Sequence, residues 1–347
     1  MNITIKQGFF FALLSFSLVF LGTASHAASD NAAILNQYAT QGSMNAVALY
    51  GSKAYIAAGS EGLVILDVNN RSNLLKLGEF PTSNYLYEVA LSQDGTKAYL
   101  AEGKQLVILD VSDPANIVEL SRINAGTTGY IEGVALSANG NQLYLANGWA
   151  GFYILDISNP STIQQLGFFN TGGYVGDVTL STDGTKVYLS DVWKGFVVMN
   201  VVDSSQPTAI AQFAPQSAST GHGFSRDIVL SPEGSIAYVL DSTDGLFILD
   251  ILDPTQPNLL GKLPMNVGVS AGITLSKDGS KVYIANGQYG NASLVTVDVS
   301  DPAQAKQLAQ LNLSQAVNVT LSADGSSSYV VGRAKGLFIL ETSQLTP

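Results

Sequence analysis

A short apolar stretch written seven times constrains the fold of this chain more than any other feature. Each copy is rich in β-branched and aromatic residues and has Asp or a related residue as its last residue but one. Short apolar runs bounded by turn signals are typical of strands buried on both faces. The copies are "LVILDV" (63–68 and 106–111), "FYILDI" (152–157), "FVVMNV" (196–201), "LFILDI" (246–251), "LVTVDV" (294–299) and "LFILET" (337–342).

One tyrosine precedes each copy, and the spacing of these tyrosines indicates the architecture. Successive tyrosines are 44 to 50 residues apart along the chain. Repeats of about 40–50 residues are typical of β-propellers with four-stranded blades. The sequence therefore predicts one all-β domain, a seven-bladed β-propeller with four strands in each blade. The aligned residues are Tyr55, Tyr99, Tyr144, Tyr188, Tyr238, Tyr283 and Tyr329.

Each repeat contains two turn signals that separate its strands. "QDGTK" (93–97) is an Asp-Gly turn that closes a hairpin, and "SDP" (112–114) ends the buried strand because proline cannot join a ladder. The last repeat stops without a fourth strand, whereas "AAILNQYATQG" (32–42) resembles a fourth strand with no blade before it. We therefore expect residues 33–40 to complete the last blade and close the ring.

The first residues have the pattern of a signal peptide. Lys6 precedes an apolar run over residues 9–22, and small residues at 25 and 27 suit cleavage after Ala27. We expect residues 1–27 to be removed and residues 28–347 to form the propeller, exported to the periplasm or the cell surface. No later segment approaches the length of a membrane span, so we expect no membrane insertion after cleavage.

Charge and cysteine content exclude several kinds of partner and site. The whole chain has a formal net charge of −11, and the predicted signal peptide carries one lysine and no acid. A chain this acidic lacks the basic surface that nucleic-acid binding requires. With no cysteine there is no disulfide, no thiolate metal site and no thiol nucleophile. We expect a monomer, because a closed ring needs no partner to cover its strand edges.

The repeat as a whole resembles a known family. The units "VALSQDG", "AYLA" and "LVILDVSDP", with their copies, resemble the LVIVD-repeat family of exported bacterial and archaeal proteins. The resemblance covers nearly all of residues 28–347. It implies a propeller at the cell envelope or surface and provides no common catalytic motif. The fourth repeat departs most, with "MNVVDSSQP" (199–207) at the turn after its buried strand.

Aromatic residues gather in the loops that vary between repeats. In a propeller, the loops between the second and third strands and those that join blades lie on one face, opposite the repetitive turns. Such loops on a rigid scaffold often carry binding sites, and exposed aromatic clusters suit protein, peptide or sugar ligands. Packing between blades is the alternative for each ring. The candidate binding residues are Trp149 and Trp193, with Tyr85, Tyr87, Tyr130, Tyr174 and Tyr289 around them, and Phe224 lies in a joining loop.

A second group of candidates is polar. Glu88, Asp177 and Asp227 share one place before a first strand, with Glu132 shifted by one residue, and this place lies near the mouth of the central channel. A partial ring of carboxylates would suit calcium, although no calcium-loop motif is present. Solvated carboxylates or partners of backbone amides are the alternative. Arg226 and His222 lie in or beside the longest joining loop.

Catalytic signals are sparse. The Asp residue that ends most buried strands recurs in too many repeats to be catalytic, and we assign it to turn hydrogen bonds. His222 is the only histidine after residue 27, which excludes a multi-histidine metal site there. We therefore expect an exported binding protein that recognises an envelope protein, a peptide or a glycan, with no cofactor. The alternative is a lactonase-like hydrolase with an acidic, calcium-dependent site at the channel mouth.

Overall fold

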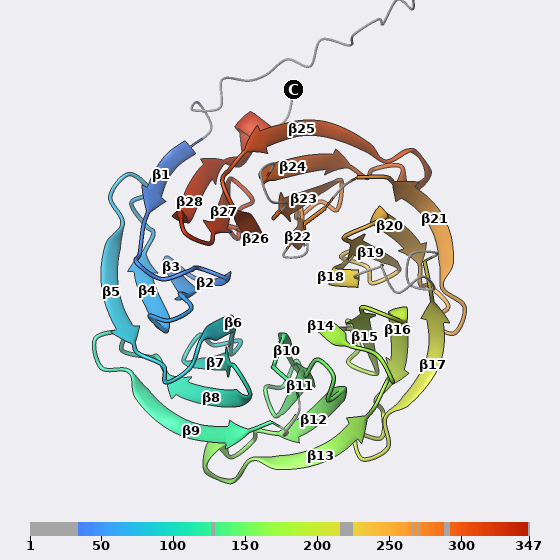
Figure 1. The fold of residues 1–347 in the computed structure, drawn as a ribbon, viewed down its shortest axis with the longest axis horizontal. Coiled ribbons are helices and arrows are strands. Elements are labelled where there is room, and N and C mark those ends of the chain that lie inside the picture. Colours follow the sequence, from blue (N-terminus) through green and yellow to red (C-terminus); the bar gives the residue numbers. More distant parts are fainter. Residues whose placement is uncertain are drawn as a thin grey trace, which may run out of the picture.

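The computed structural model describes residues 34–125, 129–215, 225–265, 267–268, 271–287 and 292–345. Seven antiparallel sheets of four strands each are arranged in a ring around a common axis (Figure 1). The seven-bladed all-β propeller predicted from the repeat is thereby confirmed. Blades 1 to 3 consist of β2 (Ala46–Tyr50), β3 (Lys53–Ala57), β4 (Leu63–Asp67) and β5 (Leu75–Phe80); β6 (Leu86–Leu91), β7 (Lys97–Glu102), β8 (Gln105–Asp110) and β9 (Val118–Asn124); and β10 (Gly133–Leu136), β11 (Gln142–Ala146), β12 (Phe152–Asp156) and β13 (Gln164–Phe169).

The remaining blades follow the same order, with the first strand innermost (Figure 1). Blades 4 to 6 consist of β14 (Val175–Leu180), β15 (Lys186–Asp191), β16 (Gly195–Asn200) and β17 (Thr208–Phe213); β18 (Ser225–Leu230), β19 (Ile236–Asp241), β20 (Gly245–Asp250) and β21 (Asn258–Leu263); and β22 (Gly272–Leu275), β23 (Lys281–Asn286), β24 (Ser293–Asp298) and β25 (Lys306–Asn312). Blade 7 contains β26 (Ala316–Leu321), β27 (Ser327–Gly332), β28 (Gly336–Glu341) and β1 (Ile34–Tyr38).

The N-terminal strand closes the ring, as the incomplete last repeat predicts. β1 pairs antiparallel with β28, with Ile34 opposite Leu340 and Tyr38 opposite Leu337. The Ile34 and Tyr38 side chains also pack against two apolar clusters that include residues of blade 7. Blade 7 is therefore built from both ends of the described chain.

The apolar core is divided into layers between neighbouring blades. The aligned tyrosines are nearly fully buried and pack into these layers. Tyr55, for example, packs with Leu86 and Leu100 of blade 2. The third strands are buried on both faces, whereas the outermost strands are half-exposed. The third strands are accordingly the most continuous apolar runs of each repeat.

The Asp residues that end the buried strands stabilise turns, as predicted. Asp110 Oδ1 accepts hydrogen bonds from Ser112 N at 3.0 Å and from Ser112 Oγ at 2.6 Å. The divergent fourth repeat makes a similar turn, because Asn200 Oδ1 accepts from Val202 N at 3.2 Å. We name the face that carries these turns the turn face. The opposite face carries the variable loops, and we name it the loop face.

Helical structure in the described residues is limited to three short 3-10 segments, η1 (Pro160–Thr162), η2 (Pro302–Gln304) and η3 (Thr342–Leu345). None of the helices in the described ranges has the length and apolarity needed to span a bilayer. The predicted signal peptide, residues 1–27, lies outside the described residues and stays a prediction.

Candidate functional site

A cavity of about 390 Å³ lies on the axis of the ring, and residues of all seven blades line it. Glu88, Asp177 and Asp227 line it from equivalent places on the innermost strands β6, β14 and β18. Glu132 and Arg333 line it as well. The structure therefore brings the four acidic residues of the channel-mouth hypothesis into one cavity.

Glycines occupy the equivalent place in blades 3 and 6, and they make room for the polar residues. A Cβ atom on Gly133 would lie 2.9 Å from Asp177 Oδ1, and one on Gly272 would lie 3.0 Å from Asn318 Cα. Real Cβ atoms rarely approach other atoms so closely. The side chains of Asp177 and Asn318 thus extend toward the preceding blades.

The two aspartates connect successive blades through backbone amides. Asp227 Oδ1 accepts from Ile228 N at 2.8 Å, and Asp227 Oδ2 accepts from Ile273 N of blade 6 at 2.9 Å. Asp177 Oδ2 accepts from Ile228 N of blade 5 at 3.3 Å. The prediction that such carboxylates bond backbone amides is confirmed for both residues. They stabilise the junctions from blade 4 to blade 6.

Asp177 and Asp227 also hydrogen bond to each other, which requires a proton on one of them. Burial raises the pKa of both carboxyl groups, and the charge of Asp177 raises the pKa of Asp227 further. Burial likewise raises the pKa of Glu88 to about 8, although Val89 N donates to Glu88 Oε1 at 2.9 Å.

The raised pKa of Glu88 predicts a stability that falls as the pH rises. The unfolded chain ionises this carboxyl near pH 4.5, whereas the folded protein keeps it protonated up to about pH 8, so its stabilising contribution is lost across that window. Glu88→Gln should unfold like the parent protein at pH 4. At pH 8 it should be more stable by on the order of 4 kcal/mol, measured by urea denaturation.

Asp94 provides a control of opposite sign. It lies in an exposed Asp-Gly turn, and hydrogen bonds from Ser92 and Thr96 lower its pKa to about 2. A lowered pKa stabilises the fold above the unfolded value and is lost as the pH falls, so Asp94→Asn should destabilise at pH 7 and have little effect at pH 2. Equal curves for Glu88→Gln and the parent at pH 8 would contradict the burial argument.

Glu132 has a different environment from the other acids. It precedes Gly133, so its carboxylate does not occupy the place of Glu88 and Asp177. Instead, the Tyr174 hydroxyl donates a hydrogen bond to Glu132 Oε1. The one-residue shift seen in the sequence therefore connects the cavity to the aromatic residues of the loop face.

Three aromatic side chains form what we name the tryptophan ridge: Trp149, Tyr174 and Trp193. The Trp149 ring packs edge-on against Trp193, with centroids 5.1 Å apart, and against Tyr174 at 5.2 Å. Both tryptophans nevertheless remain about half exposed, at 54% and 50%. Large apolar rings held rigidly and still exposed are typical of recognition surfaces.

Three tyrosines form a second group, the tyrosine group: Tyr85, Tyr87 and Tyr130. The centroids of Tyr85 and Tyr87 are 4.9 Å apart, and those of Tyr87 and Tyr130 are 6.1 Å apart. Tyr87 also lines the cavity, and Lys104 Nζ lies over the Tyr130 ring at 5.7 Å from its centroid. The tyrosine group therefore extends from the cavity to the outer part of the loop face.

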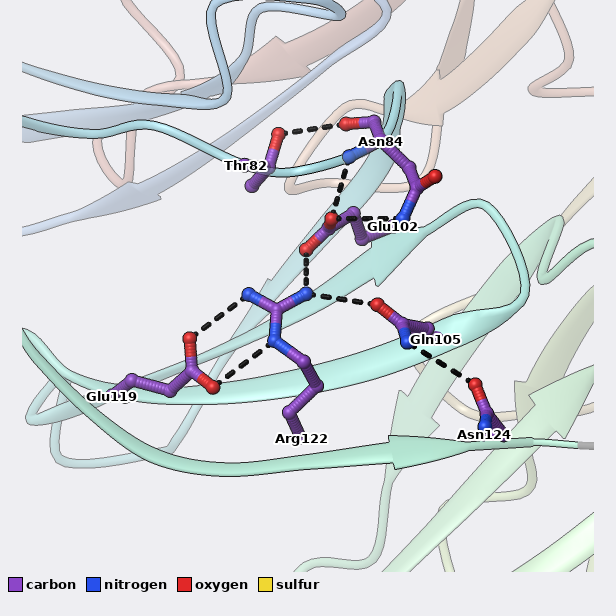
Figure 2. A network of polar contacts seen from close by, with 7 residues as sticks. All are labelled: Thr82, Asn84, Glu102, Gln105, Glu119, Arg122 and Asn124. Atoms are coloured by element: carbon purple, nitrogen blue, oxygen red, sulfur yellow. Dashed lines mark hydrogen bonds and ion pairs between the residues drawn. The ribbon is translucent and has the colours of Figure 1, made fainter.

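A buried polar network holds the loop that carries Tyr85 (Figure 2). Glu102, at the end of β7, is fully buried, and its Oε1 accepts from Asn84 N at 2.7 Å and from Asn84 Nδ2 at 3.2 Å. Arg122 Nη1 pairs with Glu102 Oε2 and donates to Gln105 Oε1 at 2.9 Å. Arg122 also forms two hydrogen bonds with Glu119, at 3.0 and 2.9 Å.

Asp191 holds the loop that carries Trp193 of the tryptophan ridge. Its Oδ1 accepts from Trp193 N and from Lys194 N, both at 2.9 Å, and its Oδ2 accepts from Thr171 Oγ1 at 2.5 Å. The sequence hypothesis missed this class of residue. In the sequence, a residue of this class can be found as a polar residue three positions after the aligned tyrosine. The residues at this position are Glu102, Asn147, Asp191, Asp241 and Asn286, and all five are buried.

The structure does not place four candidate residues from the sequence at the cavity or in the aromatic groups. Tyr289, His222 and Phe224 lie outside the described residues, and Arg226 belongs to β18 beside Asp227. In the part of the chain that the structure describes, no group of three or more His, Cys, Asp or Glu side chains is arranged to hold a metal ion. Calcium binding stays a prediction, which elemental analysis of the purified protein would test.

Comparison with models of protein families shows which family the chain belongs to. The model of the LVIVD repeat matches residues 41–82, 88–125, 128–171, 222–263 and 278–307. The chain belongs to the LVIVD-repeat family. The resemblance noted in the sequence is thereby confirmed, and this LVIVD-repeat protein is a seven-bladed propeller. A search of curated proteins gives no match.

Solved structures support the fold of this LVIVD-repeat protein at low sequence identity. The β-propeller domain of Cps50 (Swd1) from Myceliophteria thermophila has a TM-score of 0.71 and 14% identity, over 89% of this chain and 98% of that one. The periplasmic gluconolactonase PpgL of Pseudomonas aeruginosa has a TM-score of 0.67 and 16% identity, over 83% and 94%. At such identities the likeness concerns the fold alone.

Proposed function

We propose that this LVIVD-repeat protein is an exported binding module that recognises a protein, peptide or glycan of the cell envelope through its loop face. The observation that carries the proposal is the tryptophan ridge, in which two half-exposed tryptophans are fixed against each other beside the central cavity. Aromatic anchors of this kind dominate the energetics of many interfaces. The signal-peptide pattern of residues 1–27 supports export to the periplasm or the cell surface.

Replacing both anchors should remove the function and leave the fold intact. The Trp149→Ala, Trp193→Ala variant should lose at least about 100-fold in affinity for a partner captured from an envelope extract, because each buried anchor is worth about 2 kcal/mol or more. Affinity would be measured by surface plasmon resonance with the captured partner.

The turn face provides a matched control. Val202 and Leu252 are 70% and 80% exposed there, at the place where Ser112 stands in blade 2. Val202→Ser with Leu252→Ser removes a comparable pair of exposed apolar groups from the opposite face and should bind normally. Equal affinity of the tryptophan variant and the parent protein would refute the proposal.

A lactonase-like hydrolase is the second candidate, because carboxyl groups line the cavity. Neighbouring carboxyl groups whose pKa values differ can act as acid and base, and burial raises the pKa of both Asp177 and Asp227, that of Asp227 further because of the charge of Asp177. A periplasmic gluconolactonase is among the proteins of similar fold. Turnover of a gluconolactone that disappears in Asp177→Asn would support this candidate, whereas equal rates with and without protein would exclude it for this substrate.

A further inference from the structure

The tryptophan ridge, the tyrosine group and the cavity form one continuous surface. Tyr87 belongs to the tyrosine group and lines the cavity. Glu132 lines the cavity and accepts the hydrogen bond of Tyr174 in the tryptophan ridge. A ligand bound to the aromatic residues would therefore also reach the cavity. Its chemistry must suit both.

The cavity is lined by more acidic than basic groups. Among the described residues, the carboxyl groups of Glu88, Glu132, Asp177 and Asp227 line it, together with one guanidinium, that of Arg333. Its volume of about 390 Å³ lies within the range of about 300–1,000 Å³ typical of ligand pockets. It is large enough to admit a side chain, and the acidic chain around it repels anions.

The aromatic residues have the same preference. Ring faces attract cations, and the ammonium of Lys104 already lies over the Tyr130 ring. A surface with aromatic rings outside and carboxyl groups inside matches a lysine or arginine side chain, whose apolar stem and charged end have the same order.

We propose that the loop face binds a basic, extended segment of a partner polypeptide, with one arginine or lysine side chain in the central cavity and the neighbouring residues on the aromatic rings. This inference rests on the proposed function and specifies its ligand. Burial raises the pKa of Glu88 and of Asp227, and a cation bound beside them would favour their ionised forms. A neutral glycan would stack on the same rings but leave the carboxyl groups without a counter-charge.

The chain provides its own probe for this test. It contains two tryptophans, and both are in the tryptophan ridge, so intrinsic tryptophan fluorescence reports on that site alone. The protein would be titrated at pH 8 with blocked hexamers of arginine, of glutamate and of alternating glycine and serine, and with a neutral glucan hexasaccharide. We expect a saturating change with the arginine hexamer only, and a dissociation constant about tenfold larger at 300 mM than at 50 mM salt.

Two variants locate the bound cation. Glu88→Gln with Asp177→Asn keeps the size of both side chains and should weaken arginine-hexamer binding at least tenfold. Arg333→Gln removes a positive charge from the lining and should tighten binding about threefold, which tests the charge even if the first variant fails to fold. Val202→Ser with Leu252→Ser should bind as the parent does.

The outcomes separate this inference from the proposed function. Saturation by the glucan or by the glycine–serine hexamer, with no response to arginine, would overturn the basic-segment proposal and leave an aromatic binding module. Arginine binding that is unchanged in the first variant and in Arg333→Gln would place the cation elsewhere and would also overturn it. The absence of a fluorescence change with every probe would also overturn the basic-segment proposal. The proposed function is tested separately, by the capture experiment with the tryptophan variant.

Discussion

A chain that lacks residues 1–38, and with them β1, should fail to form a stable monomeric propeller. Without β1, the buried strand β28 becomes an edge with unpaired backbone groups. The deletion also exposes apolar surface that Ile34 and Tyr38 cover, and it removes the hydrogen bond from Asn36 Nδ2 to Arg71 O at 2.9 Å. We expect a loss on the order of 5 kcal/mol, a large part of the stability of a typical domain.

Thermal unfolding followed by circular dichroism and size-exclusion chromatography would measure this effect. Deletion of residues 1–33 is the matched control, because it leaves the whole of β1 in place. The control should unfold cooperatively as a monomer, whereas the longer deletion should melt at a much lower temperature or associate through its open edge. A longer deletion that remains monomeric with an unchanged melting temperature would show that the pairing of β1 with β28 is dispensable.

Arg122→Met should destabilise the protein by about 3–5 kcal/mol, because it leaves a buried carboxylate without its partner. Glu102 has no exposed surface, and Arg122 is the cation that pairs with it (Figure 2). Burial of an unpaired charge costs far more than loss of a surface ion pair. The midpoint of urea denaturation would record the change.

The double variant separates the charge from the packing. Glu102→Leu with Arg122→Met removes both charges and should recover most of the stability. It should still disturb the loop before β6, because Asn84 N and Asn84 Nδ2 then have no carboxylate acceptor. A cycle in which the double variant is as unstable as Arg122→Met alone would show that the network acts through packing rather than through charge.

Local patterns in the sequence were sufficient for the architecture. The seven apolar strands, the aligned tyrosines and the Asp turn residues lie within single repeats, where the order of strands and turns follows from short-range chemistry. Even the closing strand was predictable, since residues 33–40 are a strand without a blade and the last repeat is a blade without its strand. The structure confirmed each of these predictions.

The residues that position the site were harder to find. Glu102 and Asp191 occupy one place in the repeat, but they hold different loops and use different partners. Their burial depends on how a loop folds back over the end of the second strand. A polar residue at the end of a strand is equally typical of solvent exposure, so its role could not be recognised from its type alone.

The sequence by itself determined the number of blades, the strands and the faces on which loops and turns lie, because these depend on periodicity and on neighbours along the chain. The tertiary structure decided which side chains meet: Asp177 with Asp227, Glu132 with Tyr174, and Trp149 with Trp193. Each pair joins residues about 40 to 50 positions apart, on neighbouring blades. These contacts, and the raised pKa values of Asp177 and Asp227, depend on the spacing between blades, which packing of the apolar layers sets and which no single repeat encodes.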